Sequence, residues 1–199
     1  MKFKLIENLI LNQEDIYINI DKFINNASNI LLVTGISGSG KSTLSKELAD
    51  KYDASIIELD YLETYLYGKI SINQLYREEQ FALIKFLESL DSKDIELDAY
   101  KLNDAYIEFL VKEYCPQDSH SRFIINGIQI YEICNSPSWL QELPIVIKGT
   151  SALVSTIRRI KRDRSYGFSD SSNIKNWIPL LKTAINADNK LSHLKQEIH

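Results

Sequence analysis

The sequence predicts an α/β fold in which a mostly parallel sheet of four to five strands is covered by helices on both faces. Short apolar runs, each closed by a glycine or an aspartate, occupy residues 30–34, 55–59, 122–126 and 144–148. Segments with helical periodicity separate these runs, and a glycine-rich turn joins the first run to the helix after it. Apolar strands that alternate with helices are typical of a parallel sheet buried on both faces, which gives three layers.

The N-terminal segment is expected to be helical and to precede the sheet. Within residues 3–25 apolar side chains recur at roughly helical spacing, as in Leu5, Leu9, Ile16, Ile20 and Phe23. We therefore assign residues 1–29 to a helical extension. The length of the chain and the lack of an obvious linker favour one domain, residues 1–199, over two.

Two later segments are also expected to be mainly helical. Residues 61–120 contain the amphipathic stretch "QLYREEQFALIKFLESL" and form a helical insertion between strands. After the last apolar run, a basic helix and a polar loop occupy residues 151–172. From residue 173 onward the pattern is helical again, with Pro179 tolerated near a helix start.

Composition limits the classes of function. Of the 199 residues, 44% are hydrophobic, and the formal net charge of -4 argues against broad, non-specific binding to nucleic acid or to an anionic membrane. Two cysteines are too few for a disulfide framework or a zinc cluster, so a reducing, cytoplasmic location is expected. Acidic residues interrupt the N-terminal apolar residues early, so we expect neither a signal peptide nor a membrane span.

The glycine-rich turn carries the most specific signal in the sequence. "GISGSGKS", residues 35–42, matches the phosphate-binding loop (P-loop) pattern G-x-x-x-x-G-K-[ST] at every fixed position. Glycines let the backbone wrap around a polyphosphate and point its N–H groups at the oxygens, and the positive end of the following helix adds to that attraction. The alternative, a glycine-rich turn with an exposed lysine, is disfavoured because the turn follows a buried strand and opens a helix.

The loop predicts the binding of a nucleoside triphosphate with Mg²⁺. We expect Lys41 to neutralise the outer phosphates, the Ser42 hydroxyl to ligate the metal ion and Thr43 to support the inner phosphate. The residues predicted to hold the nucleotide in this loop are Gly35, Ser37, Gly38, Ser39, Gly40, Lys41, Ser42 and Thr43.

Asp60 follows the second apolar run, where the carboxyl ends of parallel strands form the ligand crevice. A carboxylate there can accept the proton of a substrate hydroxyl that attacks the terminal phosphate. Alternatively, Asp60 caps the next helix, since Glu63 follows three residues later and completes the pattern of a capping box.

The basic helix after residue 151 is a candidate lid. "IRRIKRDRS" carries five cations, and Arg158 and Arg162 lie one turn apart on one face, with Arg159 beside Arg162 at the alternative spacing. Cations that fold over a bound nucleotide offset charge as the phosphoryl group moves. A solvated basic face is the ordinary explanation for such a run.

Together these segments resemble the uridine kinase and phosphoribulokinase-like branch of small P-loop kinases. "TGISGSGKSTLSKEL", "IIELDYL", "FIINGIQIY" and "IRRIKRD" occur in the order, and near the spacing, of that branch, and cover residues 30–62 and 122–167. The resemblance implies a P-loop kinase fold in which residues 61–120 bind the substrate and residues 151–172 form the lid. It implies ATP as the phosphoryl donor, Asp60 as base, and Arg159 and Arg162 as catalytic lid residues, with Arg164 as a further lid candidate. From the loop and the basic helix we also predict Lys41 as a catalytic cation, and Arg158 and Arg162 as nucleotide contacts.

The chain departs from that branch at two places. Asn126 stands where the branch usually has a glutamate, so Mg²⁺ must rely on Ser42, Asp60 and water, or on a substitute such as Glu58 or Glu132. The tyrosine-rich region 61–120 matches no nucleoside-recognition pattern.

The function predicted from the sequence is transfer of the γ-phosphoryl group of ATP to a hydroxyl of a small molecule, nucleoside-like or sugar-like. Two alternatives stay open at this point. In one, the hydroxyl belongs to a macromolecule or a conjugate, such as a modified DNA base, an RNA end or a sugar nucleotide; the basic run 158–164 favours nucleic acid, but the acidic whole does not. In the other, Asn126 marks a non-catalytic module that binds ATP for regulation. The oligomeric state is not predicted.

Overall fold

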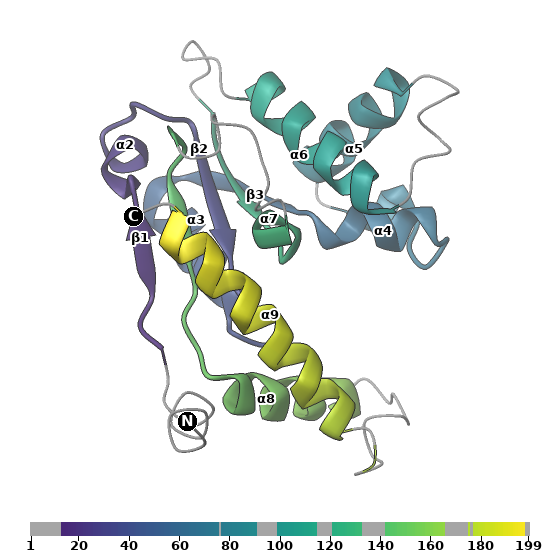
Figure 1. The fold of residues 1–199 in the computed structure, drawn as a ribbon. Helices are drawn as coiled ribbons and strands as arrows, with labels where there is room; N and C mark the ends of the chain where they lie inside the picture. Colours follow the sequence, from purple (N-terminus) through teal and green to yellow (C-terminus); the bar gives the residue numbers. More distant parts are fainter. Residues whose placement is uncertain are drawn as a thin grey trace.

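The computed structural model describes residues 13–75, 77–90, 99–114, 121–132, 142–165, 175 and 177–197. Five strands form one sheet in the order β1-β5-β2-β4-β3, and all neighbours are parallel except the edge pair β1 and β5 (Figure 1). The strands are β1 (Ile16–Ile18), β2 (Ile30–Thr34), β3 (Ala54–Glu58), β4 (Arg122–Asn126) and β5 (Ile145–Ile147).

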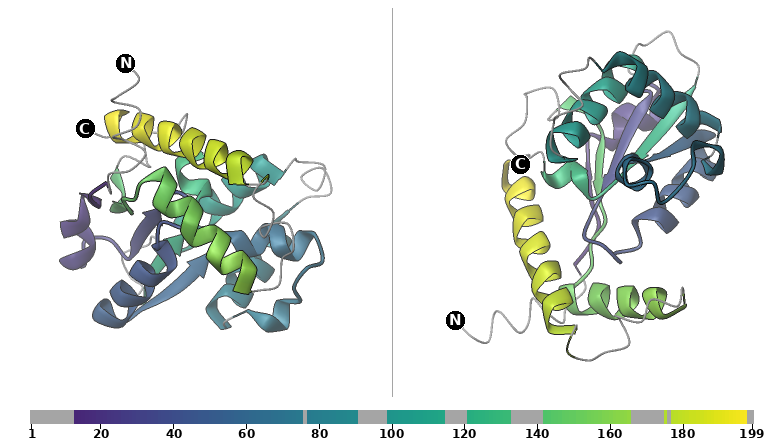
Figure 2. Two further views of the ribbon diagram at one scale, coloured as in Figure 1. Left: turned by 90° about the horizontal axis from the view of Figure 1, so that it is seen from below. Right: turned by 90° about the vertical axis from the view of Figure 1, so that its right-hand side faces the viewer.

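Helices cover both faces of the sheet, as Figures 1 and 2 show. The helices are α2 (Ile20–Ile24), α3 (Lys41–Tyr52), α4 (Asp60–Leu66), the 3-10 helix η1 (Ile72–Gln74), α5 (Arg77–Ser89), α6 (Ala99–Tyr114), α7 (Gln129–Glu132), α8 (Ala152–Ser165) and α9 (Trp177–Glu197). Within the described ranges, every helix is too short or too polar to cross a bilayer.

The central strand β2 shows why the chain folds in three layers. All five of its side chains are buried, and neighbouring residues face opposite ways because side chains alternate along a strand. Ile30 and Leu32 belong to the core cluster shared with α4, α5 and α6, whereas Leu31 and Val33 belong to the cluster shared with α2 and α3. The predicted α/β fold with a mostly parallel sheet is therefore confirmed.

The sheet brings the predicted site segments to one edge. β2 lies between β4 and β5, so the carboxyl end of β2 and the loop after it are flanked by the ends of both neighbours. In the parallel registers, Asn126 of β4 pairs with Val33 on one side and with Glu58 on the other. The side chains that follow these strands consequently meet at the same edge.

The N-terminal helix expected over residues 3–25 is wrong where the structure describes it. Ile16–Ile18 form the edge strand β1, which pairs with β5, and only Ile20–Ile24 are helical. Ile16, Ile18 and Ile20 also alternate with polar or exposed residues, a spacing of two that fits a strand as well as a helix. Residues 1–12 lie outside the described residues.

The remaining predicted strands and helices agree with the structure to within a few residues. β2 and β4 have the predicted bounds, while β3 and β5 differ from the predicted runs by one residue at their ends. The insertion between β3 and β4 is helical in its described parts, α4 to α6, and the basic helix is α8. Residues 166–172 of the predicted lid lie outside the described residues, so the assignment of residues 151–172 to a lid stays a prediction.

Candidate active site

The P-loop connects the central strand β2 to helix α3. Gly38 and Gly40 adopt φ angles of 86° and 99°, in the left-handed region that favours glycine. The Ser39 N–H donates to the Ile36 carbonyl at 3.0 Å, which closes a turn, and Gly40 is the N-cap of α3. The loop therefore directs the positive end of α3 toward the space that it encloses.

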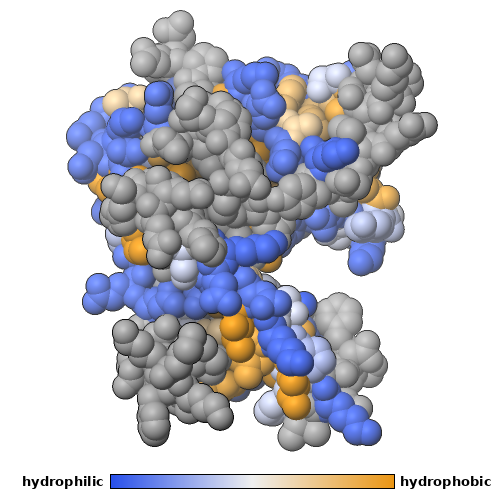
Figure 3. Space-filling model, in the orientation of Figure 1, coloured by the Kyte–Doolittle hydropathy of each residue, from blue (hydrophilic) through white to orange (hydrophobic). Residues whose placement is uncertain are grey.

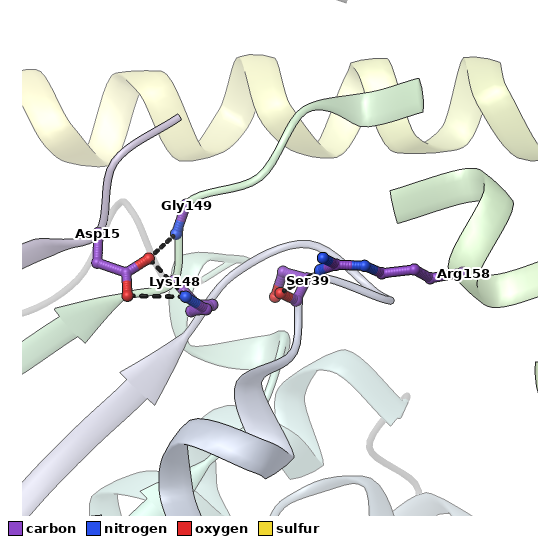
Figure 4. A network of polar contacts seen from close by, with 5 residues as sticks. All are labelled: Asp15, Ser39, Lys148, Gly149 and Arg158. Carbon is purple, nitrogen blue, oxygen red and sulfur yellow. Dashed lines mark hydrogen bonds and ion pairs between the residues drawn. The ribbon is translucent and has the colours of Figure 1, made fainter. Parts of the chain in front are cut away.

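Helix α8 is held directly against this loop. The Ser155 hydroxyl donates to the Ser37 carbonyl. Arg158 Nη1 donates to the Ser39 carbonyl at 3.2 Å (Figure 4). A Cβ atom on Gly38 would lie 2.6 Å from the Ser155 carbonyl oxygen, so only glycine permits this approach. The base of the predicted lid is thus fixed to the P-loop.

Replacing Gly38 with alanine is expected to destabilise the chain by about 1–3 kcal/mol more than replacing Gly68, because the new methyl group would meet the Ser155 carbonyl. Gly68 is a matched control: its φ is also positive, at 66°, but nothing lies within 4 Å of its Cβ position. Urea denaturation of both variants measures the difference. Equal destabilisation would show that α8 does not press on the loop.

The segment before β1 supports the loop from the other side. Lys148 Nζ lies 2.8 Å and 2.9 Å from the two carboxylate oxygens of Asp15, and the Gly149 N–H donates to Asp15 at 2.9 Å (Figure 4). A Cβ atom on Gly35 would lie 2.8 Å from the Lys148 carbonyl. Asp15 therefore orders the backbone on which the start of the P-loop packs.

A polar cavity of about 480 Å³ lies over the P-loop. It is lined by Ser37, Gly38, Gly40, Lys41, Ser42, Thr43, Glu58, Asp60, Gly127, Ile128, Arg158, Arg159 and Arg162. Most of the residues that the sequence analysis predicted for the site line this cavity. Two predicted residues do not: Gly35 packs beneath Lys148, and the Ser39 side chain is buried.

Asp60 lies at the cavity as the first residue of α4, and its carboxylate does not cap that helix. The N-cap is Leu59, with no side-chain cap hydrogen bond. Asp60 Oδ1 instead accepts a hydrogen bond of 2.9 Å from Gln129 Nε2 at the start of α7. Gln129 is buried, so it fixes the direction of the carboxylate.

Asn126 links the P-loop to the end of β3. Its Nδ2 donates to Glu58 Oε2 at 2.7 Å and lies 3.4 Å from Ser42 Oγ, while its Oδ1 is buried without a hydrogen-bond partner. Glu79, almost completely buried on α5, accepts the Glu58 N–H at 3.1 Å. Of the two candidate substitute acids, Glu58 therefore lies in direct contact with Asn126.

Electrostatics in the cavity depend on burial. Burial raises the pKa of the Glu58 carboxyl above its ordinary value, although the hydrogen bond from Asn126 opposes that shift. Burial likewise lowers the pKa of the Lys41 ammonium, and the nearby Asp60 and Glu58 carboxylates oppose it, whereas Arg162 adds to it. A bound anion would compensate the desolvated charge of Lys41.

Several residues that shape the site were not predicted, among them Gln129 and Ser155. Gln129 lies three residues after β4. The sequence feature that could have identified it is a polar side chain inside the apolar run "GIQIY". Ser155 has no such feature, since a small polar residue in a basic helix is unremarkable until its contact with the loop is seen. Arg164, a lid candidate, lies over the Trp177 ring at 5.6 Å and does not line the cavity. The Glu132 side chain lies outside the described residues.

Comparison with known proteins gives weak similarity to one kind of enzyme. No protein-family model matches the chain. The chain is 26% identical over 160 residues to the tRNA dimethylallyltransferases of Thermoanaerobacter sp. (strain X514) and Thermoanaerobacter pseudethanolicus (strain ATCC 33223 / 39E). The alignment covers 80% of this chain and 42% of each relative, so the chain spans less than half the length of the relatives it matches.

These relatives overturn the function predicted from the sequence. Their names describe transfer of a dimethylallyl group to tRNA, which is neither phosphoryl transfer to a hydroxyl, on a small molecule or a macromolecule, nor regulation without catalysis. The ATP-dependent alcohol phosphotransferase is therefore wrong, and the comparisons do not support the uridine kinase branch. What the structure does show is an α/β fold with a glycine-rich turn between β2 and α3, which is consistent with a P-loop fold.

Proposed function

We propose that the chain transfers a dimethylallyl-type prenyl group from a diphosphate ester to a nucleophilic group of an RNA. The observation that carries the proposal is the shared cavity, which the P-loop and Asp60 line together. Transfer of this kind needs a cradle for an anionic leaving group beside a proton acceptor. The names of the relatives supply the transferred group and the acceptor class.

The reaction balances with the groups in this cavity. The bond between the allylic carbon of the donor and the diphosphate oxygen breaks, and that carbon forms a bond to a nitrogen or oxygen of the acceptor. The proton of the acceptor passes to the Asp60 carboxylate, which Gln129 orients. Inorganic diphosphate leaves with the bonding electrons, and the loop N–H groups and Lys41 stabilise its charge.

Mg²⁺ is proposed to bind with the diphosphate, next to Ser42 and Asp60. Across the described ranges, no group of three or more His, Cys, Asp or Glu side chains could hold a metal ion alone. The arrangement suits Mg²⁺, which usually keeps several waters and takes one or two carboxylates plus phosphate oxygens. When bound, the ion neutralises charge on the leaving diphosphate.

The cationic helix α8 supports an RNA partner in spite of the acidic whole. Arg158, Arg159 and Arg162 line the cavity, where they are proposed to contact the diphosphate. Lys161 and Arg164 are exposed on the same helix and extend the positive charge away from it. A local strip of cations is sufficient to attract RNA phosphates.

In this proposal the cavity binds a diphosphate ester in place of the ATP that the sequence predicted. A P-loop cradles phosphates and does not by itself choose what they are attached to. Competition between MgATP and inorganic pyrophosphate for the chain measures whether the cavity also accepts a triphosphate.

The test is transfer of label from radioactive dimethylallyl diphosphate to unmodified tRNA transcripts in the presence of Mg²⁺. Label in the acid-precipitated RNA, abolished by excess inorganic pyrophosphate, is expected. Parallel reactions with MgATP in place of the donor are followed for ADP. ADP formation that the RNA stimulates, with no label transferred from the prenyl donor, would contradict the proposal.

A further inference from the structure

A second, smaller pocket lies between α8 and α9. It is next to the polar cavity over the P-loop, which is called the phosphate cavity from here on. The two helices pack against each other, as Figures 1 and 2 also show. The pocket has a volume of about 170 Å³, and α9 contributes Leu180, Ala184 and Ala187 to its wall. Figure 3 shows apolar surface gathered over this end of the molecule.

The pocket and the phosphate cavity are neighbours with a common wall. Ser37 of the P-loop, Ile128 after β4 and Arg159 of α8 line both of them. Because both spaces border these three residues, a ligand whose phosphates lie on the P-loop would have its other end next to the pocket. Arg159 stands at the junction, where the bond between the two ends would lie. Its buried Nε makes no hydrogen bond and lies 3.8 Å from Asp163 Oδ2 in an ion pair.

The chemistry of the wall selects a small apolar group. Ile128, Leu180, Ala184 and Ala187 are the apolar residues of a lining that also includes Thr183, Asn186 and Lys190. The two alanines leave space that larger residues would fill. Moving a branched five-carbon chain, about the size of a leucine side chain, from water to such a wall lowers the free energy. We infer that this pocket holds the prenyl group of the diphosphate donor, so that α9 selects the chain length. This inference rests on the proposed function and deepens it.

Filling the pocket should separate the prenyl end of the donor from its phosphate end. In full-length Ala184→Leu, affinity for dimethylallyl diphosphate is expected to fall about tenfold, while affinity for inorganic pyrophosphate stays near that of the wild type. Asn189→Leu is the matched control, because Asn189 is an exposed residue of α9 outside the pocket wall. Isothermal titration calorimetry gives both dissociation constants for each variant.

The deciding quantity is the ratio of the two dissociation constants, because damage to the phosphate cradle changes both alike. If the ratio of the dissociation constant for dimethylallyl diphosphate to that for pyrophosphate rises in Ala184→Leu and not in Asn189→Leu, the inference is supported, and an unchanged ratio overturns it. A second variant, Leu180→Ala, enlarges the pocket and should improve binding of geranyl diphosphate relative to dimethylallyl diphosphate; an unaltered preference also counts against the inference. If the wild type binds neither diphosphate ester nor pyrophosphate, the proposed function itself has failed.

Discussion

Replacing Lys41 with methionine is expected to weaken binding of inorganic pyrophosphate by about 10- to 100-fold, since a hydrogen bond to a charged group contributes about 1.5–3 kcal/mol. Lys41 is the first residue of α3 and lines the phosphate cavity. Its Nζ donates to the Ile36 carbonyl of its own loop at 3.3 Å, a long hydrogen bond that a phosphate oxygen would replace with a stronger one. Methionine keeps the apolar stem and removes the charge.

The same substitution should make the ligand-free chain harder to unfold. Burial lowers the pKa of Lys41, which means that the folded protein disfavours the protonated form that is present near neutral pH. Removing that ammonium removes the cost. Lys51→Met is the control, because Lys51 is an exposed residue in the last turn of the same helix. Calorimetric titration and thermal unfolding measure the two effects, and unchanged pyrophosphate binding would mean that the loop does not hold the anion.

The strands and the loop were predictable because their signals are local. β2 and β4 are continuous apolar runs, which strands need when helices cover both faces of a sheet. The P-loop pattern fixes glycines, a lysine and a hydroxyl at set spacings, and Gly38 shows why: a side chain there would meet α8. These steric and chemical requirements restrict residue types at positions close together in the sequence, so a short window is enough to detect them.

Features that depend on distant partners were not predictable. β1 is a strand because it pairs with β5, more than a hundred residues away, and its three residues fit a helical pattern equally well. The contact of Asp15 with Lys148 and that of Gln129 with Asp60 arise from the sheet order in the same way. Residue spacing within a short stretch of sequence does not predict such long-range contacts.

The reaction was mispredicted for a chemical reason. The P-loop pattern predicts that phosphates bind, and Asp60 predicts a proton acceptor nearby. Neither feature predicts which bond breaks. In phosphoryl transfer the phosphorus atom is attacked, whereas in prenyl transfer the carbon is attacked and the phosphates leave. Both reactions place negative charge in the same cradle, so the same residues serve either one.

Replacing Asp60 with asparagine is expected to lower the rate of prenyl transfer about 10²- to 10⁴-fold, which is the usual range for loss of a general base. Asparagine has nearly the same shape, and its Oδ1 can still accept the hydrogen bond from Gln129, so the geometry of the cavity should persist. Single-turnover transfer of label to RNA measures the rate, and Asp50→Asn, an exposed position of α3 outside the cavity, is the control.

Asp60 is also proposed to lie next to Mg²⁺, and the same variant separates the two roles. If the carboxylate serves mainly as a metal ligand, Asp60→Asn will bind Mg²⁺ more weakly, and a large excess of Mg²⁺ will restore the rate. If it serves mainly as the proton acceptor, saturation with Mg²⁺ will leave the rate low, because the amide cannot take up the proton at any metal concentration. We expect the second result, since Ser42 and the diphosphate oxygens would keep the metal ion in place without Asp60. Full recovery with Mg²⁺ would instead make Asp60 a metal ligand and leave the base to be found elsewhere.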